Sequence, residues 1–218
     1  VAWRVTYTPQ PTPRCDMSNK QPLIHRLYPV WMAFMIGILM ALPPMVSAVT
    51  IRVGASNDPA CSAFSIQGAI AQLPPGLTEH RLLLSSNQTY TTAGVITDRH
   101  LHIEGGYANC SAAEPTPGAR SQIGPDATAT APLLTLFGTT GIQLPLTLRA
   151  LSFVGPAPQG AVRASGNMRV YVEDTWVMNA GDLFLDNAGG IAIEDQTILH
   201  LRGTTQIVGN TGGEGGGV

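Results

Sequence analysis

The chain has 218 residues and a net charge of −2, and only 12% of its side chains are charged, against about 25% in an ordinary soluble domain. It contains no run or stripe of basic residues of the kind that binds the phosphate backbone of nucleic acids. We therefore expect no nucleic acid as a partner. Glycine accounts for 24 of the 218 residues, which exceeds its usual share of about 7%. The low number of charged residues argues against many solvent-exposed helix faces.

The amino-terminal segment has the order of a secretory signal peptide. Basic residues after Met17 precede the 12-residue apolar run Trp31–Leu42, and two prolines and the small residues up to Ala48 follow. The run is shorter than the ~20 residues of a membrane-spanning helix, which favours cleavage after Ala48 over a membrane anchor. Because Val1 is not methionine, we interpret Met17 as the start; a non-Met start codon is the alternative. The sequence thus predicts an upstream stretch over 1–16, a signal peptide over 17–48 and a domain over 49–218.

Removal of the signal peptide leaves two cysteines, Cys61 and Cys110. In an oxidising compartment we expect them to form a disulfide, which closes a loop of 49 residues. The chain-entropy model gives such a bridge about 4 kcal/mol. A catalytic or metal-binding cysteine is the alternative, but no Cys-x-x-Cys spacing is present.

The segment between the cysteines predicts one short amphipathic helix over 63–73, followed by strands over 81–90 and 95–107. A helix before the first coil of a repeat fold would cover its otherwise open end. His100 and His102 share one face of the second strand, where two metal ligands could lie. Since Leu101 and Ile103 would point toward the core, we interpret both histidines as exposed surface residues.

Three strands of alternating polarity follow, over 146–153, 170–176 and 199–207. The alternation directs one set of apolar residues inward, namely Leu146, Leu148, Val170, Val172, Leu199 and Leu201. It leaves Thr147, Tyr171 and His200 on the other face. The strand starts lie 24 and 29 residues apart, which is too far for hairpin partners but suits one coil of a repeat fold. We therefore predict a parallel β-helix.

Several segments carry a resemblance to a known class of protein. The segments 61–70, 89–90 and 101–110 resemble the start of bacterial secreted right-handed parallel β-helix proteins of the pectin-lyase-like fold. Phe184-Leu-Asp-Asn187 before Gly189-Gly190-Ile191-Ala192 is similar to the Phe-x-x-Asn and Gly-Gly-aliphatic repeats of polymorphic outer membrane proteins. A second copy runs from Ile207, in place of the usual Phe, to Val218. The resemblance spans about 49–218 and implies an all-β, right-handed parallel β-helix with a short N-terminal capping helix.

The resemblance implies two classes of function, because this fold hosts both polysaccharide lyases and hydrolases and non-catalytic adhesins or passenger domains. The fold alone does not decide between them. The acidic pairs Glu173-Asp174 and Glu194-Asp195 would bind calcium or raise a carboxylate pKa if they stacked on adjacent strands. We favour separate solvated turns, since neighbouring like charges cost stability. No other cofactor and no catalytic residue is predicted.

Aromatic residues offer a second candidate for binding. Tyr171 and Trp176, with Arg169 close in sequence, could stack against sugar rings, although Trp176 fits the core equally well. The chain stops within a repeat, and an open last coil would expose a sheet edge, so we expect 49–218 to be the N-terminal part of a longer domain. A translocator barrel or anchor downstream would attach it to the outer membrane.

We therefore expect a secreted or bacterial cell-surface passenger or adhesin-like domain that is non-catalytic and presents a surface to polysaccharides or to a host. The alternative is the N-terminal part of a polysaccharide lyase or glycoside hydrolase of the pectin-lyase-like fold.

Overall fold

The computed structural model describes residues 47–74, 76–91, 94–97, 99–125, 131–138, 141–157, 159–181, 189–212 and 217. These residues lie within one compact unit, Val46–Val218. The predictions for 1–46 and for the motif 184–187 lie outside the described residues, as do Gly216 and Val218 of the second motif. No helix within the described part of the chain is both long and apolar enough to span a membrane.

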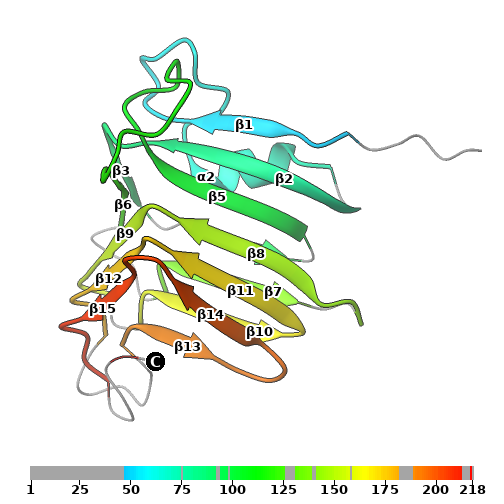
Figure 1. Ribbon diagram of the computed structural model, residues 1–218, viewed down its shortest axis with the longest axis vertical. Helices are drawn as coiled ribbons and strands as arrows, with labels where there is room; N and C mark the ends of the chain where they lie inside the picture. Colours follow the sequence, from blue (N-terminus) through cyan, green and yellow to red (C-terminus); the bar gives the residue numbers. More distant parts are fainter. Residues whose placement is uncertain are drawn as a thin grey trace, which may run out of the picture. The chain divides into compact units, whose positions relative to one another are not determined.

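The strands form three sheets in which every pair described is parallel (Figure 1). The six-stranded sheet has the order β1 (Thr50–Val53), β2 (Gly76–Ser85), β5 (Arg99–Tyr107), β8 (Leu144–Arg149), β11 (Met168–Glu173) and β14 (Ile198–Arg202). The five-stranded sheet has the order β15 (Gln206–Val208), β12 (Trp176–Met178), β9 (Leu151–Val154), β6 (Ser121–Gly124) and β3 (Thr89–Thr91). The four-stranded sheet has the order β13 (Ile191–Ile193), β10 (Val162–Gly166), β7 (Leu134–Gly138) and β4 (Gly94–Thr97). An all-β fold of parallel sheets is thus confirmed.

From β2 onward, the chain visits the three sheets in a fixed rotation. A strand of the six-stranded sheet is followed by one of the five-stranded sheet and then by one of the four-stranded sheet, after which the chain returns to the first. Each return adds a strand beside the previous strand of that sheet. Residues one rotation apart in sequence therefore become neighbours in space.

Each of the three predicted C-terminal strands is in fact two strands that belong to different sheets. The breaks fall at Ala150, Asp174 and Gly203, whose backbones adopt left-handed φ angles of 51°, 49° and 61°. The predicted extents were wrong because alternation continues on both sides of each corner, so that the period does not reveal the turn. The predicted strands 81–90 and 95–107 divide in the same way, into β2 and β3 and into β4 and β5.

The inward and outward assignments within β8 and β11 are confirmed. Leu146, Leu148, Val170 and Val172 are at most 1% exposed and lie in the main core cluster. On β14, Leu199 packs partly against that core, but Leu201 is 48% exposed, against the prediction. Within the described residues β14 is the last strand of its sheet, so its inward residues have a neighbouring strand on one side only.

The predicted helix is present as α2 (Ile66–Gln72), shorter than the predicted range. It begins after Ser65, whose Oγ accepts a hydrogen bond from the Gly68 N–H at 3.0 Å, as expected of an N-cap. Ile66, Ala69 and Ile70 are buried and belong to the same core cluster as the strands. The helix lies beside β1, where the six-stranded sheet begins (Figure 1).

The predicted pairing of Cys61 with Cys110 is confirmed by a disulfide in the structure. It ties the segment before α2 to the loop after β5. Gly54 is required beside it, because a Cβ atom there would lie 2.5 Å and 2.6 Å from the two sulfur atoms. Asp58 lies near both cysteines, but the bond between their sulfurs leaves no thiolate for a metal ion.

Candidate functional site

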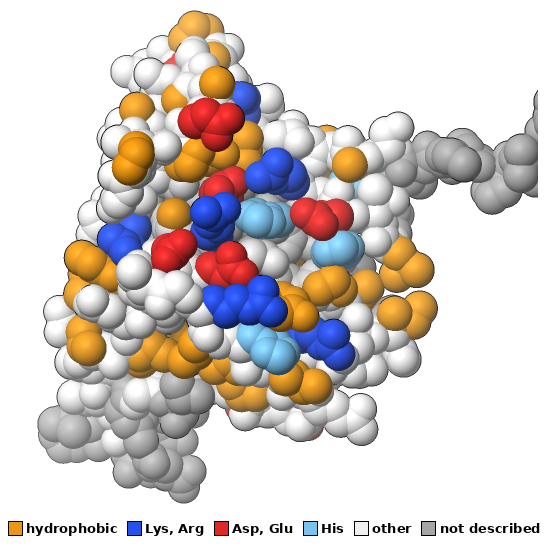
Figure 2. Space-filling view, in the orientation of Figure 1, with side chains coloured by type: hydrophobic (Ala, Val, Ile, Leu, Met, Phe, Trp, Pro, Cys, Tyr) orange, Lys and Arg blue, Asp and Glu red, His pale blue; other side chains and the backbone are white. Residues whose placement is uncertain are grey.

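The outward face of the six-stranded sheet carries a row of charged residues of alternating sign. The register of β5, β8, β11 and β14 places Glu104 beside Arg149, Arg149 beside Glu173, and Glu173 beside Arg202. Figure 2 shows acidic and basic side chains gathered on this face. Because each residue has an opposite charge on the neighbouring strand, the row stabilises the parallel register.

Glu104 is the buried member of this row, with a side chain only 5% exposed. Its carboxylate lies 3.0 Å from Arg81 Nη2 and 3.3 Å from Arg149 Nη1, and it accepts a hydrogen bond from the Tyr107 hydroxyl at 3.1 Å. Burial, followed by the nearby charge of Glu104, raises the pKa of Tyr107, so the phenol remains a donor. These partners compensate the desolvation of the carboxylate.

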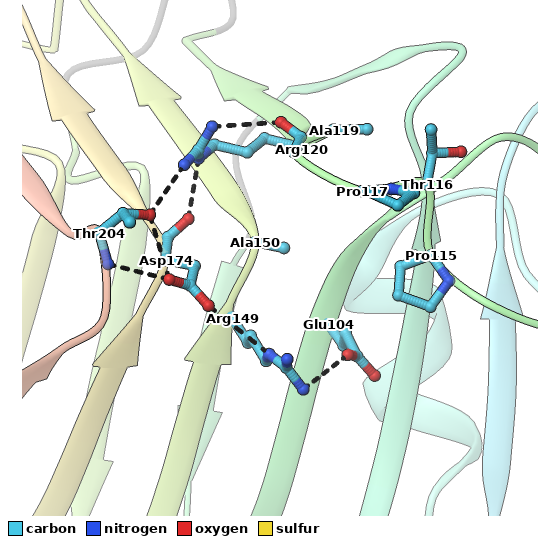
Figure 3. Close-up of a pocket in the computed structure, with 11 residues that line it drawn as sticks. Glu104, Pro115, Thr116, Pro117, Ala119, Arg120, Arg149, Ala150, Asp174 and Thr204 are labelled. Carbon is cyan, nitrogen blue, oxygen red and sulfur yellow. Dashed lines mark hydrogen bonds and ion pairs between the residues drawn. The ribbon is translucent and has the colours of Figure 1, made fainter.

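A pocket of about 310 Å³ opens above the end of this row (Figure 3). One wall is the loop Pro115–Ala119, and the charged lining comes from Glu104, Arg120, Arg149 and Asp174. Thr204 completes the lining from the turn after β14. The pocket therefore combines carboxylate acceptors, guanidinium donors and a hydroxyl group.

Asp174 is held in the pocket by two hydrogen bonds from one residue. Its Oδ1 accepts hydrogen bonds from the Thr204 N–H at 2.9 Å and from the Thr204 hydroxyl at 3.1 Å. The backbone hydrogen bond from Thr204 is the main reason why the pKa of Asp174 is lowered, with the Thr204 hydroxyl and the nearby Arg149 and Arg120 charges adding to it. The carboxylate is therefore ionised at neutral pH.

Arg120 forms the rim of the pocket and joins three parts of the chain. Its Nε donates to the Asp174 carbonyl at 2.8 Å, and its Nη2 donates to Thr204 Oγ1 at 3.4 Å. The guanidinium also lies over the Trp176 ring, 4.1 Å from the ring centre, in a cation–π contact.

The corner between the six-stranded and five-stranded sheets explains how the sequence builds this pocket. Asp174 adopts a left-handed φ angle there, which Asp tolerates better than most residues. Gly203 occupies the matching corner after β14, and a Cβ atom on it would lie 2.2 Å from Asp174 Oδ1. The glycine therefore leaves room for the carboxylate to reach Thr204.

The structure does not bring the two predicted acidic pairs together. Asp174 and Glu173 lie at the end of β11, which pairs with β8 and β14, whereas Glu194 and Asp195 follow β13, which pairs with β10 in another sheet. Glu173 contacts Arg202 at 3.2 Å, and Glu194 contacts Arg163 at 2.8 Å. Asp195 accepts a hydrogen bond from the Gly166 N–H. The adjacent-strand arrangement that a shared calcium site required is absent from this described region.

The predicted aromatic pair also divides between two sheets. Tyr171 lies on the outward face of β11 and stacks on His200, with ring centres 4.8 Å apart, while Arg202 covers the ring at 4.5 Å. Trp176 lies on β12, beneath Arg120, and its buried Nε1 has no hydrogen-bond partner. Trp176 therefore supports a pocket residue without lining the pocket, whereas Tyr171 belongs to the open sheet face.

Most of the pocket residues were missed by the sequence analysis, namely Glu104, Arg120, Arg149 and Thr204. One signal was present, because a charged residue directly follows each inward apolar pair, in Leu-His-Ile-Glu104, Leu-Thr-Leu-Arg149, Val-Tyr-Val-Glu173 and Leu-His-Leu-Arg202. Four repeats of this pattern indicate one row across a parallel sheet.

No protein-family model, curated protein or solved structure matches this chain.

Proposed function

We propose that residues 49–218 form a right-handed parallel β-helix capped by α2. The rotation of the chain through three parallel sheets supports this proposal, as does the addition of one strand to each sheet per rotation. The burial of the inward residues from successive strands in one continuous core also supports it.

We further propose that this unit is a secreted or bacterial surface domain of the adhesin or passenger type, which binds a polysaccharide without cleaving it. The observation that carries the proposal is the pocket formed by Arg120, Arg149, Asp174 and Thr204. Its volume of about 310 Å³ suits one or two sugar units, and its donors and acceptors are those that pair with sugar hydroxyl groups.

Binding is favoured over hydrolysis because of the protonation state of Asp174. A glycoside hydrolase needs one carboxylic acid with a raised pKa to protonate the leaving oxygen. The pKa of Asp174 is instead lowered, chiefly by the backbone hydrogen bond from Thr204. Asp174 is therefore suited to accept hydrogen bonds from a ligand.

Binding of the full chain to a panel of bacterial and host polysaccharides, followed by calorimetry on the best ligand, tests this function. We expect Asp174→Asn and Arg120→Gln to weaken binding at least about tenfold, equivalent to ~1.4 kcal/mol. Glu194→Gln, on another sheet, serves as the matched control and should bind as the wild type does.

Two results would count against the proposal. Unchanged affinity in both pocket variants would mean that the pocket is not the binding site. Release of new sugar ends or unsaturated products by the wild type would replace it with the lyase or hydrolase alternative.

A further inference from the structure

A second cluster of polar side chains lies on the outward face of the six-stranded sheet, away from the pocket residues along β5. His100 and His102 flank the buried Leu101, and Glu79 of β2 lies between them. The Glu79 Oε2 atom is 3.4 Å from His100 Nε2, and the Oε1 atom is 3.9 Å from His102 Nδ1. No sequence pattern predicted that Glu79 lies beside this histidine pair.

An irregularity in the pairing of β2 with β5 brings Glu79 to this position. Gly76 pairs with Arg99 and His80 pairs with Leu101, so three residues of β2 lie opposite the single residue His100. Such bulges change the direction of a side chain and are common beside functional sites. His80, the next residue, is fully buried, while the Glu79 side chain remains 48% exposed.

We propose that Glu79, His100 and His102 form a binding site for a divalent transition-metal ion of the zinc class. Two imidazole nitrogens and one carboxylate oxygen are a ligand set that zinc accepts, with a fourth position open to water or to a ligand. The site is independent of the sugar-binding proposal.

The surroundings of the histidines suit this role. The His102 Nε2 atom is buried without a hydrogen-bond partner, so Nδ1, which faces Glu79, is the ring nitrogen available to an ion. The nearby Arg81 and Arg149 both pair with Glu104, which offsets their repulsion of a cation.

In the structure, the ligand atoms of Glu79, His100 and His102 do not yet converge on one point. The imidazoles contact different oxygens of the same carboxylate, so a shared ion requires both rings to turn toward one point. The side chains of His100 and His102 are only 28% and 19% exposed, whereas that of Glu79 is 48% exposed, so the carboxylate has the most room to change rotamer.

Calorimetric titration of the intact, oxidised chain with Zn²⁺ alone tests the site. We expect one ion per chain and a rise in Tm upon binding. Glu79→Gln, His100→Ala and His102→Ala should each weaken binding at least about tenfold. His200→Ala is the matched control, because His200 occupies the row of His102 three strands away, on β14, and this variant should retain the wild-type Kd.

The Glu79→Gln variant keeps the size of the side chain and changes no inward residue, so its folding can be verified by circular dichroism before titration. The absence of both heat and a Tm shift in the wild type would overturn the proposal. A folded Glu79→Gln variant with the wild-type Kd would also overturn it, as would equal weakening by His200→Ala.

Discussion

Two histidines make the stability of the molecule depend on pH. Burial lowers the pKa of His80, which is fully buried and accepts a hydrogen bond from the Val49 N–H at 3.1 Å, and burial likewise lowers the pKa of His102. The unfolded chain, with ordinary values near 6.5, binds protons first as the pH falls. The free energy of unfolding should therefore be constant above about pH 7 and should decrease below pH 6.5.

Urea unfolding between pH 7.5 and pH 5 measures this slope. We expect His80→Asn, whose Oδ1 can replace Nδ1 as the acceptor for Val49, to reduce the slope, and His102→Asn to reduce it further. An unchanged slope in the double variant would show that other groups determine it.

Gly203 is the residue whose conformation the pocket requires. We expect Gly203→Ala to destabilise the fold by about 1–3 kcal/mol, because it places a Cβ atom at a left-handed φ angle and against Asp174 Oδ1. Gly141→Ala is the control, since a Cβ atom there meets no heavy atom within 4 Å. Equal urea midpoints for the two variants would contradict the role of this corner.

At the scale of the elements, the members of the charged row across β5, β8, β11 and β14 contribute unequally to the free energy of unfolding. Glu104 is buried and holds three partners, so Glu104→Ala leaves the Tyr107 hydroxyl without this acceptor, Arg81 without its carboxylate, and Arg149 with only Asp174 at 4.0 Å. We expect a loss of ~2 kcal/mol, below the full value for a buried pair because both arginines are nearly half exposed. Glu173→Ala, in the more exposed pair with Arg202, should cost less than about 1 kcal/mol. Equal losses in denaturant titrations would contradict this difference.

The elements also show how far the sequence could be interpreted. The alternation in Leu146–Leu148 and Val170–Val172 correctly predicts which face is buried, because that pattern arises directly from the strand pleat. The corner at Ala150 was not predictable from residue type, because alanine rarely adopts a left-handed φ, whereas Asp174 is a residue type that favours turns.

The pocket was harder to predict than the fold, because its residues come from distant parts of the chain. Arg120 lies in the loop before β6, whereas Thr204 follows β14. The register of the strands brings Glu104 and Asp174 to the same pocket, and only a comparison of the four repeated strand patterns indicates that register. Trp176 shows the same limit of local reasoning, because its role depends on the arginine that covers it.

At the scale of the whole molecule, the Cys61–Cys110 bridge connects the segment before α2 to the loop after β5. The paired variant Cys61→Ser with Cys110→Ser should lose about 2–4 kcal/mol, since the unfolded chain regains the freedom of a 49-residue loop. Urea unfolding with and without reductant measures the loss. The reductant should lower the midpoint of the wild type and leave that of the paired variant unchanged; a wild-type midpoint insensitive to reductant would contradict the prediction.

The contacts of Arg120 affect the order in which parts of the molecule unfold. In a stack of repeating turns, each turn contacts only its neighbours, so unravelling starts at an end and proceeds one turn at a time. Arg120 bypasses this order, because it bonds Asp174 and Thr204, which lie 54 and 84 residues further along the chain. The Arg120 side chain therefore links segments that strand pairing alone does not connect, and it does so at the pocket that all three residues line.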